Sequence, residues 1–189
     1  MHPSRIAVAT AAFDQPLKTA LQTAADMGAD AVQLDARGEL RPADLSETGR
    51  RQLLHHLAEL NLGIASLSLP TRRAFYDLDQ LDARLAKTRE VMQFAWELKA
   101  PLVTLRVGRI PAADSGEYRL LVEVLNDLAR HGNRVGAVLA VTPTRDEPQL
   151  LARLMGEITQ GPVGIDFDPA GFAMNGADAV AAYRELHEL

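Results

Sequence analysis

The sequence contains no cysteine, so disulfide bonds, thiolate chemistry and zinc–sulfur sites are excluded. It also lacks any apolar run close to the roughly 20 residues that a helix needs to cross a bilayer. The first residues, Met1-His-Pro-Ser-Arg5, do not have the apolar centre of a signal peptide. From these absences we expect a cytoplasmic protein with no membrane partner.

Positive charge is not in excess, because 20 lysine and arginine residues stand against 25 aspartate and glutamate residues, for a net charge of −5. Proteins that bind the nucleic-acid backbone need a basic stripe, so the balance argues against nucleic acid as the main partner. Hydrophobic residues make up 47% of the chain, which is enough to bury a core. We expect one domain over residues 1–189.

Short apolar segments alternate along the chain with segments of helical periodicity, in strict βα order. Strands are expected at 5–10, 30–35, 64–69, 101–107, 134–141 and 161–169. Helices are expected at 16–27, 46–60, 79–99, 116–131, 147–158 and 176–187, with Ser46 as a helix cap. This alternation predicts a parallel sheet covered by helices, with right-handed crossovers.

Two α/β architectures agree with this order: an open doubly wound sheet, and a (β/α)₈ TIM barrel of which six βα units are present. No glycine-rich loop follows the first strand, since Thr10-Ala-Ala-Phe-Asp14 has no glycine, and this disfavours a dinucleotide-binding fold. In the second to fifth strands, one row of alternate residues is apolar and the other becomes more polar toward the C-terminal end. A barrel explains this difference, because one row packs under helices and the other lines the interior.

The interior of a barrel opens at the C-terminal mouth, where barrel enzymes place their sites. The residues expected there are Thr10, Gln33, Asp35, Ser68, Arg106, Thr142, Asp166 and Asp168. A carboxylate is rarely buried without a partner or a metal, so Asp168 is the first candidate for chemistry. It can equally be a turn residue, because Asp-Pro commonly begins a turn.

Five segments, in order, resemble the xylose isomerase-like TIM barrels of the sugar phosphate isomerase/epimerase superfamily. They are residues 24–35, 61–68, 95–103, 134–140 and 163–169. The resemblance implies a divalent metal (Mn, Mg, Co or Zn) at the mouth, held by acids and a histidine from the last four strands. The metal and the acids would move a proton or hydride between neighbouring carbons of a sugar.

The resemblance assigns the sixth-strand metal ligand to Asp168. The fifth-strand position falls on Thr142, which is not a carboxylate, and the sequence stops at Leu189, where a seventh strand is expected. We therefore expect a C-terminally incomplete barrel with an incomplete metal site, and self-association through its unclosed edges. The implied function is that of a sugar or sugar-phosphate isomerase/epimerase-like protein.

The expected substrate contacts are Gln33, Asp35, Ser68, Arg106 and Thr142. Gln33 and Asp35 can instead be surface or loop-capping residues, and Arg106 can bind a phosphate or a sugar acid. The alternative function is a non-catalytic small-molecule-binding or scaffold barrel, in which an Arg106–Asp168 ion pair replaces the metal.

The loop after the third strand carries Arg72, Arg73 and Tyr76, which suit either recognition or an ordinary solvated loop. Trp96 is expected in the core.

Overall fold

The computed structural model describes residues 5–187, which form one parallel six-stranded sheet. The strands are β1 (Ala7–Ala9), β2 (Ala31–Asp35), β3 (Gly63–Ser68), β4 (Leu102–Leu105), β5 (Val138–Val141) and β6 (Val163–Ile165). Each strand pairs in parallel with the next one along the chain, so the order is β1-β2-β3-β4-β5-β6. This sequential order is that of a TIM barrel, because a doubly wound sheet reverses its strand order midway.

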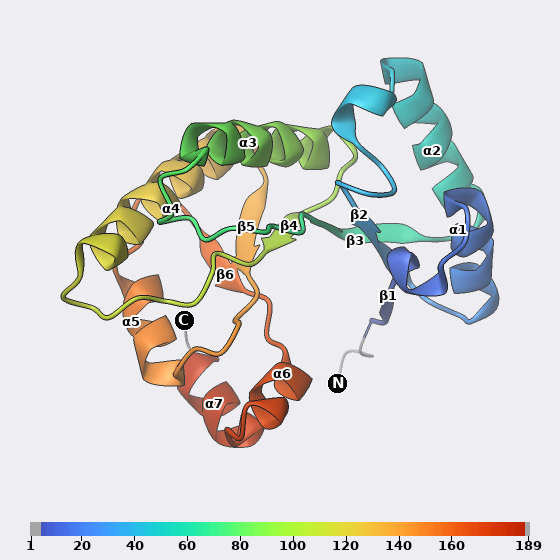
Figure 1. Cartoon of the computed structure of the whole chain (residues 1–189). Helices are drawn as coiled ribbons and strands as arrows, with labels where there is room; N and C mark the ends of the chain where they lie inside the picture. Colours follow the sequence, from blue (N-terminus) through green and yellow to red (C-terminus); the bar gives the residue numbers. More distant parts are fainter. Residues whose placement is uncertain (1–4, 188–189) are drawn as a thin grey trace.

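The helices lie on the outer side of the curved sheet (Figure 1). They are α1 (Leu17–Asp26), α2 (Glu47–Glu59), α3 (Leu81–Glu97), α4 (Gly116–Val135), α5 (Pro148–Gly156), α6 (Pro169–Met174) and α7 (Ala179–Leu186), with 3₁₀ turns at Thr10–Phe13 and Pro42–Asp44. The six βα units predicted from the sequence are thereby confirmed. No helix within residues 5–187 combines the length and the apolar character that a membrane span requires.

Helix ends follow the local sequence. The Ser46 hydroxyl accepts a bond from the Gly49 amide at 3.2 Å, so the predicted cap of α2 is confirmed. Ser115 caps α4 in the same way through the Tyr118 amide at 3.0 Å. Gly136 has a φ of 84°, a left-handed conformation that ends α4 and that glycine adopts without strain.

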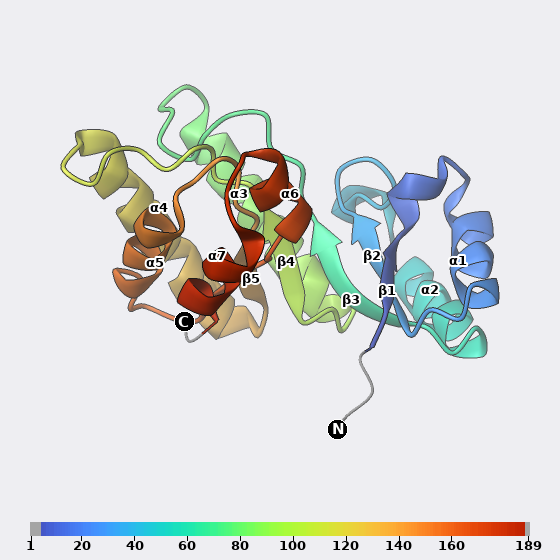
Figure 2. The same ribbon diagram turned by 90° about the horizontal axis from the view of Figure 1, so that it is seen from below.

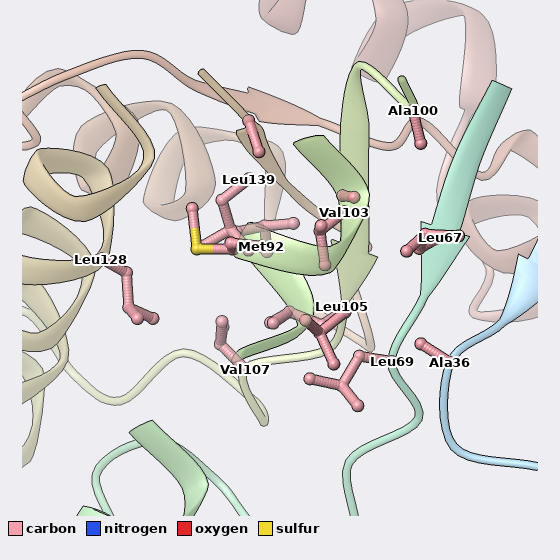
Figure 3. Close-up of a cluster of buried hydrophobic side chains, with 14 of the residues drawn as sticks. Ala36, Leu67, Leu69, Met92, Ala100, Val103, Leu105, Val107, Leu128 and Leu139 are labelled. Carbon is pink, nitrogen blue, oxygen red and sulfur yellow. The ribbon is translucent and has the colours of Figure 1, made fainter. Parts of the chain in front are cut away.

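The main core lies between the sheet and the helices. The row of Val103, Leu105 and Val107 is almost completely buried, at 0%, 3% and 1% exposure, and Figure 3 shows these side chains together with Met92 and Leu139. The apolar rows predicted from alternation therefore pack under the helices. Burying each such side chain stabilises the fold by about 1.5–3 kcal/mol relative to exposure.

Three local predictions are wrong: the bounds of the fifth strand, the bounds of the sixth strand and the burial of Trp96. The fifth strand starts at Val138, not Arg134, because α4 continues to Val135 and ends only at Gly136. The sixth strand ends at Ile165, and Pro169 begins the unexpected helix α6, since proline suits the first position of a helix.

Trp96 is 56% exposed rather than in the core. The buried stripe of α3 runs through Val91, Met92 and Ala95, and Trp96 lies beside that stripe.

β1 and β6 are the edges of the sheet, and each pairs with one neighbour only within the described residues. A cavity of about 230 Å³ beside β6 is lined by residues that include Val163, Ile165, Phe167 and Tyr183. Unpaired edges are templates for association. Self-association through these edges stays a prediction of the sequence.

Candidate functional site

The C-terminal ends of the strands lie on one side of the molecule. Figure 2 shows β3 pointing toward the side where α6 and the long connection between β3 and α3 lie. On that side, the register aligns Asp35 with Ser68 and Ser68 with Thr104. An irregularity between Val32 and Gln33 shifts the β2–β3 register by one residue, so that Gln33 pairs with Ser66. The inner face of the sheet therefore carries adjacent polar side chains from β2, β3 and β4.

A hydrogen-bond network joins these side chains. The Gln33 amide nitrogen donates to Ser66 Oγ at 2.9 Å and more weakly to Thr104 Oγ1 at 3.4 Å. Thr10, which is fully buried, donates to the Gln33 carbonyl at 3.1 Å and to Glu39 Oε2 at 2.8 Å. Within residues 5–187 the side-chain oxygen of Gln33 accepts no hydrogen bond, and Ser68 has no side-chain partner. Polar groups that remain available therefore face the interior.

Asp35 shapes the loop that follows β2. Its Oδ1 accepts bonds from the amides of Arg37, at 2.7 Å, and Gly38, at 3.1 Å, while its own amide donates to Glu39 Oε2 at 3.0 Å. This geometry is that of an Asx turn, the loop-capping role open from the sequence. Glu39, which links Thr10 to this loop, was not expected at the site, because no local pattern distinguishes it from other loop acids.

The two aspartates after β6 have different partners. Asp166 Oδ2 accepts a bond from the Thr142 hydroxyl at 2.8 Å, which links the ends of β5 and β6. Asp168 is the N-cap of α6, and its Oδ1 accepts from the Gly171 amide at 2.9 Å. The predicted site residues Thr142 and Asp166 thus meet, whereas Asp168 serves the local helix.

Asp168 also lines a cavity of about 140 Å³ together with Asp146, Glu147 and Asn175. Both oxygens of Asp146 are occupied, since they accept from the amides of Ile110 at 2.7 Å and Thr144 at 2.9 Å. Across residues 5–187, no group of three or more His, Cys, Asp or Glu side chains is arranged to hold a metal ion. The donor set around Asp168 therefore does not make a metal centre by itself.

The ion pair expected between Arg106 and Asp168 is not formed within the described part of the chain. Arg106 follows β4 directly and is exposed, and its carbonyl accepts a bond from the Thr71 hydroxyl at 2.5 Å. Asp168 lies two strands away, where its carboxylate caps α6 instead.

The loop after β3 is anchored rather than freely solvated. Phe75 is fully buried and its amide donates to the Val107 carbonyl at 2.8 Å, while the Tyr76 hydroxyl donates to the Arg109 carbonyl at 2.8 Å. Burial, and then the carboxylates of Glu117 and Asp146, raise the pKa of Tyr76. In the sequence, the large apolar side chain of Phe75 in a loop with charged residues is the feature that indicates this anchoring.

The same loop carries an ion-pair cluster. Arg73 Nη1 contacts Asp77 Oδ2 at 3.0 Å and Asp79 Oδ2 at 2.8 Å. A bond from the Asp79 amide, and then the Arg73 guanidinium, lower the pKa of Asp77. The loop is therefore held by a buried ring at one end and by charges at the other.

If Asp168 acts mainly as a helix cap, its two simplest substitutions separate. Asp168→Asn keeps a cap of similar quality, so we expect a free energy of unfolding close to that of the original protein. Asp168→Ala loses the bond to Gly171 and is expected to destabilise the fold by about 1 kcal/mol. Denaturant unfolding measures both. Equal destabilisation by the two variants, or stabilisation by millimolar Mn²⁺ that both abolish, would contradict the capping role.

With the fold and the polar mouth defined, comparison with known proteins identifies the family. The family model described as xylose isomerase-like TIM barrel matches residues 21–188, and the chain belongs to this family. The xylose isomerase-like TIM barrel family named by the sequence resemblance is thereby confirmed. A comparison with curated proteins gives no match.

Solved structures share the fold at low sequence identity. A xylose isomerase domain protein from Planctomyces limnophilus has a TM-score of 0.84 at 20% identity, covering 100% of this chain and 72% of that one. A xylose isomerase-like TIM barrel protein from Mycobacterium smegmatis in complex with magnesium has a TM-score of 0.77 at 18% identity, covering 98% and 72%. A sugar phosphate isomerase/epimerase from Parabacteroides distasonis has a TM-score of 0.72 at 12% identity, again covering 98% and 72%. These similarities establish the fold.

Proposed function

We propose that this chain is a sugar- or sugar-phosphate-binding barrel of the isomerase/epimerase type, with its ligand site at the C-terminal mouth. The observation that carries the proposal is the row of Gln33, Ser66, Ser68 and Thr104, in which hydrogen-bonding capacity remains unused. A sugar has closely spaced hydroxyls that both donate and accept, which suits an interior of amide and hydroxyl groups. The sugar phosphate isomerase/epimerase among the structural neighbours supports the same ligand class.

The chain's own residues would bind and orient the sugar. The Gln33 amide is held by Ser66 and Thr104, so its free oxygen has a defined direction from which to accept a sugar hydroxyl. Asp166, which is fixed by Thr142, offers a carboxylate at the opposite part of the mouth. A carboxylate so placed can hold a second hydroxyl or accept a proton from it.

A divalent metal is the cofactor that the family suggests, and one neighbouring structure contains magnesium. In this chain Asp168 is the candidate ligand, because one of its oxygens is not engaged in the cap. The described residues do not complete a coordination sphere around Asp168, so they do not match the set of acids and a histidine that the family resemblance implies. We therefore derive no catalytic step through a metal, and the proposed role of these residues is ligand binding.

Titration of sugars by calorimetry tests the proposal. We expect D-ribose or D-fructose to bind, and Gln33→Met, which keeps the side-chain volume and removes the amide, to weaken binding roughly ten-fold. Ser68→Ala should weaken it less, because a single neutral hydroxyl is lost. Thr159→Ala, in the exposed connection from α5 into β6 at the opposite end of the strands, removes a hydroxyl away from the mouth and should leave binding unchanged. Sugar binding that is absent, or equal in all four proteins, would refute the proposal.

A further inference from the structure

A further cavity, of about 470 Å³, lies between the connection that follows β3 and the first turns of α3. Five cationic side chains line it and no acidic side chain does. They are Arg37, Arg72, Arg73, Arg84 and Lys87. Such a concentration is unexpected in a chain whose net charge is −5. The cavity is therefore a local reversal of the protein's overall charge.

Three separate segments bring these cations together. Arg37 lies in the loop after β2, and Arg72 and Arg73 lie in the loop after β3. Arg84 and Lys87 are three residues apart on α3, so they lie on the same face of the helix. The first loop is tied to the second, because Arg37 Nη1 donates to the Pro70 carbonyl at 2.8 Å. The convergence is thus a product of the tertiary structure, on the side where the strands end.

Only some of this charge is neutralised by acids outside the cavity. Arg73 pairs with Asp77 and Asp79, and Lys87 pairs with Glu90 at 3.0 Å. Among the described residues, neither Arg37 nor Arg72 forms an ion pair. Two or more positive charges therefore face the cavity without a counter-charge.

Arg84 gives the clearest sign of a missing partner. Its Nη1 and Nη2 donate to the carbonyls of Asp79 and Asp77, so the guanidinium is held by neutral groups only. Its Nε is buried and has no hydrogen-bond partner among the described residues. A buried donor without an acceptor is costly, so the hydrogen-bonding capacity of Arg84 is not fully used within the described residues. An oxyanion in the cavity would add a favourable charge interaction to this guanidinium, which lines the cavity.

We propose that this cavity binds the phosphate group of a phosphate monoester, and that the sugar ligand of the mouth is a sugar phosphate. A monoester is close to a dianion at neutral pH and presents three acceptor oxygens, which suits guanidinium groups converging from several sides. Asp35 and Ser68 end the two strands whose loops supply Arg37 and Arg72, so the cavity lies at the same end of the sheet as the polar mouth. The sugar half of this inference rests on the proposed function, whereas the anion site does not.

Calorimetric titration of the whole chain with inorganic phosphate, D-ribose 5-phosphate and D-ribose tests the inference. We expect both phosphates to bind and D-ribose 5-phosphate to bind at least ten-fold more tightly than D-ribose. Arg72→Gln should weaken both phosphates by roughly five- to ten-fold without changing D-ribose binding, and Arg37→Gln should act in the same way. Affinity for the phosphates should fall between 50 and 300 mM salt, roughly, because ion pairing is screened.

Arg119→Gln is the matched control, since Arg119 is an exposed arginine of α4 outside the cavity and its replacement changes the net charge equally. If Arg119→Gln weakens phosphate as much as Arg72→Gln does, or if neither cavity variant weakens it, the anion site is refuted. If Arg72→Gln weakens phosphate binding but Gln33→Met leaves D-ribose binding unchanged, the anion site is upheld and the sugar-binding function is refuted. The reverse pattern would refute the phosphate site and leave the function standing.

Discussion

Leu139→Ala is expected to destabilise the protein by about 2–5 kcal/mol, the largest effect of any single substitution considered for this chain. Leu139 is completely buried in β5, and its register neighbours are Val103 in β4 and Val163 in β6. Figure 3 shows it within the cluster that includes Met92 and Val103. Removing its terminal carbons leaves a cavity that a sheet bonded on both sides cannot close. Urea unfolding followed by circular dichroism measures the change.

Two controls define what this result means. Leu139→Met keeps the volume and is expected to cost less than about 1.5 kcal/mol. Leu78→Ala makes the same chemical change at a side chain that is 75% exposed, and should stay within about 0.5 kcal/mol of the original protein. A Leu139→Ala variant as stable as Leu78→Ala would contradict the burial of β5.

Gly132→Ala is expected to destabilise the protein by about 1–3 kcal/mol, although alanine is the better helix former. A Cβ at Gly132 would lie 2.4 Å from the Ala137 carbonyl oxygen and 2.7 Å from Met92 Cε. The methionine can move, but the carbonyl belongs to the segment that leads from α4 into β5 and is held by the Ala137 amide's bond to Gly132 at 3.2 Å. The helix end or the start of β5 must therefore shift.

Gly156→Ala is the matched control, because Gly156 is also helical and a Cβ there meets nothing within 4 Å. We expect it to be neutral or to stabilise the fold by up to about 1 kcal/mol. In thermal unfolding, the midpoint should therefore fall for Gly132→Ala and stay the same or rise for Gly156→Ala. If both alanines stabilise the protein, the close approach of α4 to the start of β5 is not as described.

The order and type of the main elements follow from local pattern. Apolar rows such as Val103, Leu105 and Val107 predict a strand with a buried side, and helical spacing with a Ser46 cap predicts α2. Boundaries were less accurate where local signals compete. The segment from Arg134 is apolar enough for a strand, yet α4 retains its first residues until Gly136 allows a left-handed turn.

The candidate site was likewise predictable from the sequence only in part. Strand alternation is sufficient to assign Gln33, Ser68 and Thr142 to the polar face, but it does not say which side chains meet. Gln33 reaches Ser66 because the β2–β3 register shifts by one residue, a feature that alternation does not reveal. The alternative function pairs Asp168 with Arg106, but one oxygen of its carboxylate accepts the neighbouring Gly171 amide and no such ion pair forms among the described residues.

The sequence by itself determined the βα alternation, the family resemblance and the polar character of the strand ends, because these depend on residue type and spacing along the chain. Only the tertiary structure decided the sequential strand order, the contact of Thr142 with Asp166 and the convergence of Arg37, Arg72 and Arg84 on one cavity. These residues are distant in the chain, and their meeting depends on how far each loop extends and where it is anchored. Non-local geometry of this kind is set by packing and register, which no local pattern encodes.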